Sequence, residues 1–191
     1  HLAPAEDAAD LGADLLAHGV LPVDDDAVLQ TYLDDQLAAS PSITGAYVGR
    51  PDGSFVLVSR DGATEDGGSR VKTITVGPDG RTSTTVQRDR DGVEVTRADD
   101  PTDTYDPRAR PWYEAAVGSE GTVWTEPYVF FASEEPGVTT AEAARGPDGE
   151  VLAVFGVDLS LRDLSDFVGR IRVSPASRAV LVDEAGLMVA S

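Results

Sequence analysis

The sequence concentrates its aromatic side chains in one region that also carries charged groups able to bind a small molecule. The chain has twelve aromatic residues, five Tyr, five Phe and two Trp, and seven of them lie between Tyr105 and Phe131. Arg108 and Arg110 belong to the same stretch, and Asp158 ends the most apolar run of the chain. Arginine binds a carboxylate through paired hydrogen bonds, whereas a carboxylate and aromatic faces bind an ammonium group. A pocket containing both sets would suit a free amino acid.

Each of these residues also has a purely structural interpretation. Arg110 could form an ion pair with Asp106, and the Trp112–Tyr113 pair could be an ordinary core anchor. Asp158 could cap the following helix, although Ser160 is better placed for that role. If these readings hold, the aromatic region is core and the chain is a ligand-free structural or dimerisation module.

Two amphipathic helices are expected to precede the first strand. One runs from about Pro4 to Gly19, with proline in its first turn and glycine after its end. The second begins near Asp25, repeats leucine at every fourth position and stops at Ser40, before a proline. The apolar face of each helix is expected to pack against another element of the fold.

The remainder of the chain predicts an antiparallel sheet with a few further helices. Alternating apolar residues separated by Pro-Asp-Gly turns are typical of hairpins. Prolines make residues 99–110 irregular, and a short helix is expected from Pro111 to about Val117. Ser160 is expected to open another helix. Strands are predicted within residues 43–49, 54–59, 71–76, 81–87, 92–97, 122–132, 137–145 and 150–159, and a last hairpin within 178–191.

These elements indicate an α+β fold with helices on one side of an antiparallel sheet of about five strands. We divide the chain into N-terminal helices (1–40), a ligand-binding module (41–172) and the start of a further module (173–191).

Composition excludes several classes of function. The 34 Asp and Glu against 15 Lys and Arg give a net charge of −19, which repels nucleic acids. The absence of cysteine, with only His1 and His18 as histidines, removes the usual parts of a zinc site or a nucleophilic triad. We expect no enzymatic activity, no metal and no cofactor. No apolar run is long enough to span a membrane, so we expect any anchor outside this segment.

The run Tyr105-Asp-Pro-Arg-Ala-Arg110-Pro-Trp112-Tyr113, followed by Tyr128 and Asp158, resembles the ligand-binding module of double Cache receptors. It is most similar to their amino-acid-binding subgroup, whose pattern is Tyr, four residues, Arg, one residue, Trp-Tyr, then a distal Tyr and Asp. The resemblance runs from about Val28 to Arg170 and implies a PAS-like fold in which residues 105–131 cap the ligand.

The resemblance also implies roles for individual residues. Tyr105, Arg110 and Trp112 would bind the carboxylate of an amino acid, and Tyr113, Tyr128 and Asp158 would bind its ammonium group. It further implies an outward-facing sensor domain of a membrane receptor with a kinase, cyclase or chemotaxis output. An amine or a small carboxylate remains an alternative ligand, and pairing of two copies through the N-terminal helix remains open.

Overall fold

The computed structural model describes residues 2–60, 67–78, 80–131, 133–170, 180–182 and 188–190. Two long helices open the chain, α1 (Ala3–Ala17) and α2 (Asp26–Ala39). The Asp25 side chain begins α2 by accepting hydrogen bonds from the backbone N–H groups of Ala27 and Val28. The leucines at every fourth position of α2 are buried, as their spacing predicts: Leu29, Leu33 and Leu37.

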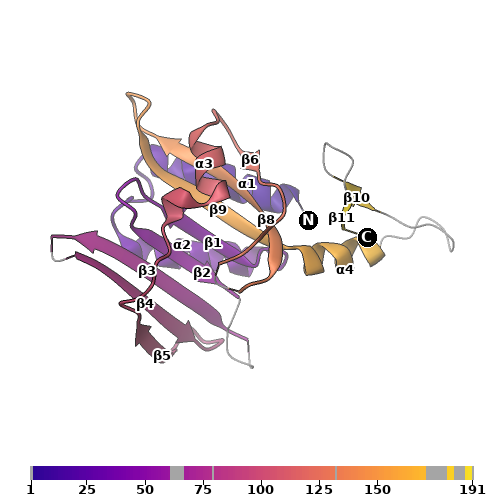
Figure 1. Cartoon of the computed structure of the whole chain (residues 1–191), viewed down its shortest axis with the longest axis horizontal. Coiled ribbons are helices and arrows are strands. Elements are labelled where there is room, and N and C mark those ends of the chain that lie inside the picture. Colours follow the sequence, from indigo (N-terminus) through magenta and orange to yellow (C-terminus); the bar gives the residue numbers. More distant parts are fainter. Residues whose placement is uncertain are drawn as a thin grey trace.

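Within the described residues, nine strands form one antiparallel sheet in the order β5-β4-β3-β2-β1-β9-β8-β6, with β7 also paired to β8 (Figure 1). The sheet is larger than the five strands expected, because β3, β4 and β5 extend one edge and the 122–132 segment contributes two separate two-residue strands. The strands are β1 (Gly45–Gly49), β2 (Phe55–Ser59), β3 (Ser69–Gly77), β4 (Gly80–Arg88), β5 (Glu94–Asp99), β6 (Val123–Trp124), β7 (Tyr128–Val129), β8 (Pro136–Arg145) and β9 (Val151–Ser160).

Among the described residues, three further helical segments lie between or after these strands. The 3₁₀ turn η1 (Pro107–Ala109) leads directly into α3 (Pro111–Val117), which has the predicted bounds. After β9 comes α4 (Leu161–Arg170), where the Ser160 hydroxyl accepts a hydrogen bond from the backbone N–H of Arg162 at 3.1 Å. Ser160 therefore caps this helix, which leaves the Asp158 carboxylate for another role.

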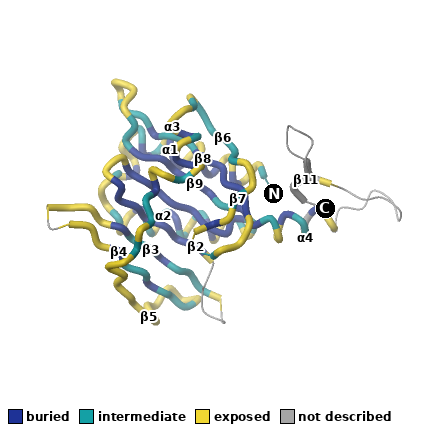
Figure 2. Tube along the Cα trace, in the orientation of Figure 1, coloured by how far each residue is buried: buried dark blue, intermediate teal, exposed yellow. Residues whose placement is uncertain are grey.

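The two faces of the central strands belong to two different cores. Alternate residues of a strand point to opposite sides of the sheet. In β1, Ala46 and Val48 join the core beneath α1 and α2, whereas Tyr47 belongs to the core beneath α3. In β9, Phe155 and Val157 likewise face the long helices. The central strands are buried on both sides, while β5 is exposed along its length (Figure 2).

The predicted C-terminal hairpin is present in part. Strands β10 (Leu181–Val182) and β11 (Met188–Ala190) pair in antiparallel fashion. The predicted boundary at residue 172 lies outside the described residues, so the division of the chain at that point stays a prediction. Among the described helices, none is both long and apolar enough to cross a membrane.

Candidate functional site

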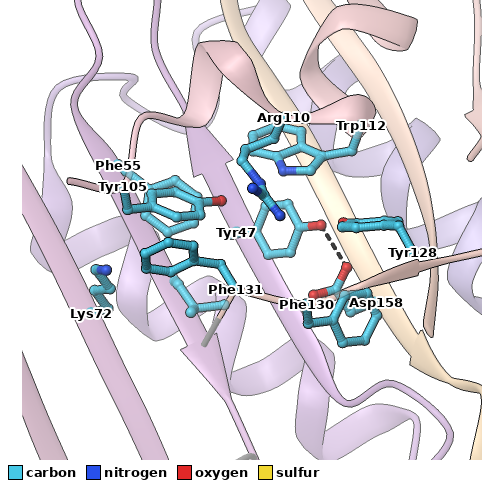
Figure 3. Close-up of a pocket in the computed structure, with 11 residues that line it drawn as sticks. Tyr47, Phe55, Lys72, Tyr105, Arg110, Trp112, Tyr128, Phe130, Phe131 and Asp158 are labelled. Carbon is cyan, nitrogen blue, oxygen red and sulfur yellow. Dashed lines mark hydrogen bonds between the residues drawn. The ribbon is translucent and has the colours of Figure 1, made fainter. Parts of the chain in front are cut away.

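A cavity lies between the α3-facing side of the sheet and the segment from Tyr105 to Phe131 (Figure 3). The volume of this cavity is about 30 Å³, the room that about two water molecules need. The wider space between the lining atoms, including part that is open to solvent, is about 440 Å³. The lining residues are mainly aromatic, with three charged side chains among them: Tyr47, Phe55, Leu57, Lys72, Tyr105, Arg110, Trp112, Tyr128, Phe130, Phe131 and Asp158.

One end of the cavity is built around the Asp158 carboxylate. Its Oδ1 accepts a hydrogen bond from the Tyr47 hydroxyl at 2.6 Å (Figure 3) and one from the Thr139 hydroxyl at 2.5 Å. Thr139 lies opposite Asp158 on β8, and its hydroxyl is also 2.7 Å from that of Tyr128. The sheet register therefore fixes the carboxylate among three hydroxyl groups, of which those of Tyr47 and Tyr128 belong to residues that line the cavity.

The position of Tyr47 depends on a glycine in the neighbouring strand. Tyr47 on β1 pairs in register with Gly156 on β9. A Cβ atom at Gly156 would lie 2.1 Å from Cε2 of the Tyr47 ring, far closer than van der Waals contact allows. Only glycine at this position lets the tyrosine ring lie across β9 and reach Asp158.

Arg110 enters the cavity from the start of α3. Within the described part of the chain, it forms no ion pair with an Asp or Glu side chain. Its guanidinium carbon lies 5.7 Å from the ring centroid of Tyr105, 5.9 Å from that of Tyr128 and 5.8 Å from that of Phe131. Such aromatic faces attract a cation without using its hydrogen-bond donors. The guanidinium fork can therefore accept an anionic ligand group.

The ion pair between Arg110 and Asp106, the structural alternative for this arginine, does not form. Asp106 instead pairs with Arg108, whose two nitrogens donate to the two carboxylate oxygens at 2.9 and 2.8 Å. The Arg108 guanidinium lies outside the cavity, against Gly53 and the carbonyl oxygen of Pro51. Arg108 and Arg110, although only two residues apart, thus have different roles.

Tyr105 and Trp112 close the roof of the cavity over the sheet. The backbone N–H of Tyr105 donates to Asp103 at 2.9 Å, and the Tyr105 ring lies 4.9 Å from that of Phe55. The Trp112 ring is 4.8 Å from that of Tyr47 and passes so close to Gly49 that a Cβ there would lie 2.7 Å away. Both rings are therefore held against the sheet.

The three tyrosines around the cavity keep their hydroxyl protons at neutral pH. Burial raises the pKa of Tyr47, Tyr105 and Tyr128, and the nearby Asp158 carboxylate raises each of them further. Protonated phenols can both donate and accept hydrogen bonds.

Five of the six residues expected from the sequence line this cavity: Tyr105, Arg110, Trp112, Tyr128 and Asp158. Tyr113 does not line it. Successive helical residues point about 100° apart, so Tyr113 turns away from the cavity, with its ring 5.5 Å from that of Trp112 and one edge against Gly49. Tyr113 instead packs against Trp112, which forms part of the roof of the cavity.

Sequence reasoning missed six of the lining residues. Tyr47, Phe55, Leu57 and Lys72 come from β1, β2 and β3, and Phe130 and Phe131 from the loop after β7. The alternation in β1 and β2 was a usable signal, since it places Tyr47, Phe55 and Leu57 on one face. The position of Lys72 depends on strand register, which the sequence alone does not specify. In the part of the chain that the structure describes, no group of three His, Cys, Asp or Glu is placed to bind a metal.

Comparisons with known proteins agree with this architecture. The family "Methyl-accepting chemotaxis protein-like, first PDC sensor domain" matches residues 29–166. The chain is 29% identical over 164 residues to adenylate cyclase 1 of Rhizobium meliloti, covering 81% of this chain and 24% of that protein. It is 39% identical over 98 residues to the methyl-accepting chemotaxis protein PctB of Pseudomonas aeruginosa, covering 50% and 15%. The chain thus spans a quarter or less of the length of these curated relatives.

A solved structure shares the fold. The ligand-binding domain of the Pseudomonas aeruginosa amino acid chemoreceptor PctB, in complex with L-Arg, superposes with a TM-score of 0.62 at 24% sequence identity. The likeness covers 100% of this chain and 62% of that one. The predicted resemblance to Cache sensor modules is therefore confirmed, as is the predicted class of helices packed on an antiparallel sheet. Because the family match spans most of the sequence, this chain belongs to the methyl-accepting chemotaxis protein-like first PDC sensor domains.

Proposed function

We propose that this sensor domain binds a free amino acid in the cavity between the sheet and α3. Arg110 binds the α-carboxylate, assisted by Tyr105 and Trp112, and Asp158 binds the α-ammonium group with Tyr128. The observation that carries this proposal is that Arg110, without an acidic partner among the described residues, lines the same cavity as Asp158.

Charge balance supports a zwitterion over a ligand with a single charge. A ligand with only an ammonium group would bring no anion to the Arg110 fork, and a simple carboxylate would bring no donor to the Asp158 carboxylate. Buried charges are costly unless they are paired. A free amino acid satisfies both groups at once. The complex of PctB with L-Arg supports the same ligand class.

The roof of the cavity must move when such a ligand enters. The cavity volume of about 30 Å³ is smaller than any amino acid requires. Phe131 is 47% exposed, and its ring contacts Tyr105 at a centroid distance of 5.2 Å. We propose that this aromatic pair opens to admit the ligand and closes over it, which shifts the population of states that the domain adopts.

The family also supports a place for this domain in a larger protein. We propose that it faces outward from the cell membrane as the sensing part of an anchored receptor, and that it catalyses no reaction itself. Pairing of two copies through α1 stays part of this proposal.

Thermal unfolding in the presence of each of the twenty proteinogenic amino acids tests the proposal first. A ligand at about 100 times its Kd adds about 2.7 kcal/mol of stability, which for a domain of this size raises the melting temperature by about 5 to 10 °C. If no amino acid raises the melting temperature, the proposal fails.

The Arg110→Ala variant then tests how the ligand is bound. We expect it to weaken amino-acid binding at least about 30-fold in isothermal titration calorimetry, because the α-carboxylate loses its paired cation. The matched control is Arg108→Ala, which removes an arginine two residues away that contacts Asp106 and not the cavity. It should change the affinity by less than about threefold. Equal effects of the two substitutions would contradict the assignment of the carboxylate to Arg110.

A further inference from the structure

Lys72 is the third charged residue of the cavity, and neither end of the zwitterion uses it. It lies on β3, at the end of the site away from Asp158 (Figure 3). Its side chain is only 12% exposed, and its Nζ is 2.8 Å from Oδ2 of Asp103, which is 4% exposed. A lysine this deeply buried at the wall of a binding cavity calls for a specific partner.

The hydrogen-bonding capacity of Lys72 exceeds what the described residues supply. An ammonium group has three donors. Among the described residues, its hydrogen-bond acceptor is Asp103, and its other neighbours are aromatic faces. Nζ lies 4.8 Å from the ring centroid of Tyr105 and 5.3 Å from that of Phe131. The Lys72 ammonium group therefore lies beside two rings, those of Tyr105 and Phe131, that also line the cavity.

Asp103 does not depend on Lys72 alone. The burial of Asp103 raises its pKa, but hydrogen bonds from Lys72 and Ser83 outweigh this effect, so the net pKa is lowered. The Ser83 hydroxyl donates to Oδ2 at 2.5 Å, and the guanidinium of Arg81 approaches the same oxygen at 3.7 Å. Because Asp103 is anionic and accepts hydrogen bonds from other donors, Lys72 can donate its remaining hydrogen bonds to a ligand.

The sheet register places Lys72 where a ligand side chain would extend. Lys72 pairs with Leu57, Leu57 with Tyr47, and Tyr47 with Gly156, so one row of residues crosses from β3 to β9. At the usual spacing between strands this row spans about 14 Å. With the ammonium group at the β9 end and the carboxylate held from the roof by Arg110, the open direction runs along Leu57 and Phe55 toward Lys72.

We infer that Lys72 selects the ligand by its side chain, favouring amino acids whose side chain ends in a carbonyl or carboxylate oxygen. This inference rests on the proposed amino-acid site and adds its side-chain specificity. An aliphatic side chain of equal length leaves the donors of Lys72 unsatisfied, and a cationic one meets a like charge in a buried site. The ligand class is therefore glutamine-like and glutamate-like amino acids, in preference to isosteric apolar or basic ones.

Calorimetric titration of the full chain with L-glutamine, L-glutamate, L-norleucine and L-lysine tests this inference. We expect the tighter of glutamine and glutamate to bind at least about tenfold more tightly than norleucine, because a hydrogen bond to a charged donor is among the stronger ones. L-Lysine should bind more weakly than norleucine.

The Lys72→Met variant should bring the ratio of norleucine to glutamine or glutamate affinities to within about threefold of one. Norleucine should bind to the variant at least as tightly as to the wild type, because no donor is left unsatisfied, and this binding shows that the variant is folded. The double variant Lys72→Met/Asp103→Asn, which leaves no unpaired buried carboxylate, should behave in the same way. The matched control is Arg81→Met, which removes a cation near the same carboxylate but outside the cavity. It should preserve the wild-type ratio.

Two results would overturn the inference and leave the proposed function standing. One is a wild-type domain that binds amino acids but prefers norleucine or L-lysine; the other is a ratio that Lys72→Met does not change. If no amino acid binds the wild-type domain, the proposed function itself fails, and this inference fails with it.

Discussion

At the scale of single residues, the site is defined by two charges that have different surroundings. Asp158 is fixed by hydrogen bonds from Tyr47 and Thr139, so its carboxylate has one orientation before any ligand arrives. Arg110 is surrounded by aromatic faces, which leave its donors available. A binding site whose groups are already oriented loses less entropy when a ligand binds. The residues therefore favour affinity for a small, doubly charged molecule.

The buried tyrosines predict how the protein responds to alkaline pH. Burial, together with the Asp158 charge, raises the pKa of Tyr47, Tyr105 and Tyr128 above the unfolded value of about 10. A raised pKa contributes stability that is fully present below about pH 10 and is lost as the pH rises through the folded pKa. The melting temperature should therefore fall steeply above about pH 10, while tyrosine ionisation should not weaken ligand binding below that pH.

Absorbance of the phenolate group during the same titration provides the check. The cavity tyrosines should ionise only as the protein unfolds. If all five tyrosines of the chain ionised near pH 10 in a protein that remained folded, the buried hydroxyl network described here would be wrong.

The residues of the site were predictable where they are close in sequence. Tyr105, Arg110 and Trp112 belong to one run, and Asp158 stands out as a carboxylate at the end of an apolar strand. Tyr113 was assigned to the same pocket by the resemblance to amino-acid-binding Cache receptors, but adjacent helical residues point in different directions. Lys72 was missed because its position depends on how β3 aligns with β2.

At the scale of elements, the site depends on the close packing of β1 against β9. Tyr47 can lie across the neighbouring strand because Gly156 has no side chain. The same strands present Ala46 and Phe155 to the long helices on the other face. A substitution that changes the packing on one face of these strands therefore also affects the packing on the other face.

Substitution of Gly156 by alanine tests this packing. The new Cβ would displace the Tyr47 ring from Asp158, and forced overpacking of this kind typically costs about 1 to 3 kcal/mol. We expect lower stability in urea unfolding and weaker amino-acid binding. Gly121→Ala is the control, because no atom lies within 4 Å of the position of its added Cβ, and it should change neither property. A Gly156→Ala variant with wild-type stability and affinity would contradict the described packing.

Most elements could be predicted because their signals are local. Pro111 and Gly118 mark the ends of α3, Asp25 begins α2, and Ser160 begins α4. The segment from Thr122 to Ala132 was predicted as one strand but forms two short ones, β6 and β7. Pro127 lies between them and has no backbone N–H to donate to a neighbouring strand. This proline indicates an interruption of the strand, which the apolar pattern of the segment did not show.

At the scale of the whole molecule, the fold separates a structural face from a binding face. The helices α1 and α2 cover one side of the sheet, and α3 with the segment up to Phe131 covers the other (Figure 1). The class of this fold followed from the order of helices and hairpins. The size of the sheet did not, because the pairing of β3, β4 and β5 at its edge depends on contacts between strands.

The central claim is that Arg110 and Asp158 bind opposite ends of one molecule. Calorimetric titration with the amino acid that gives the largest thermal shift, with its decarboxylated amine and with its deaminated acid, tests it most directly. We predict that the amino acid binds and that each analogue binds at least about 30-fold more weakly, because each lacks one of the two charged groups that Arg110 and Asp158 are proposed to bind. An analogue that binds as tightly as the amino acid would show that one of the two charges does not contact the ligand.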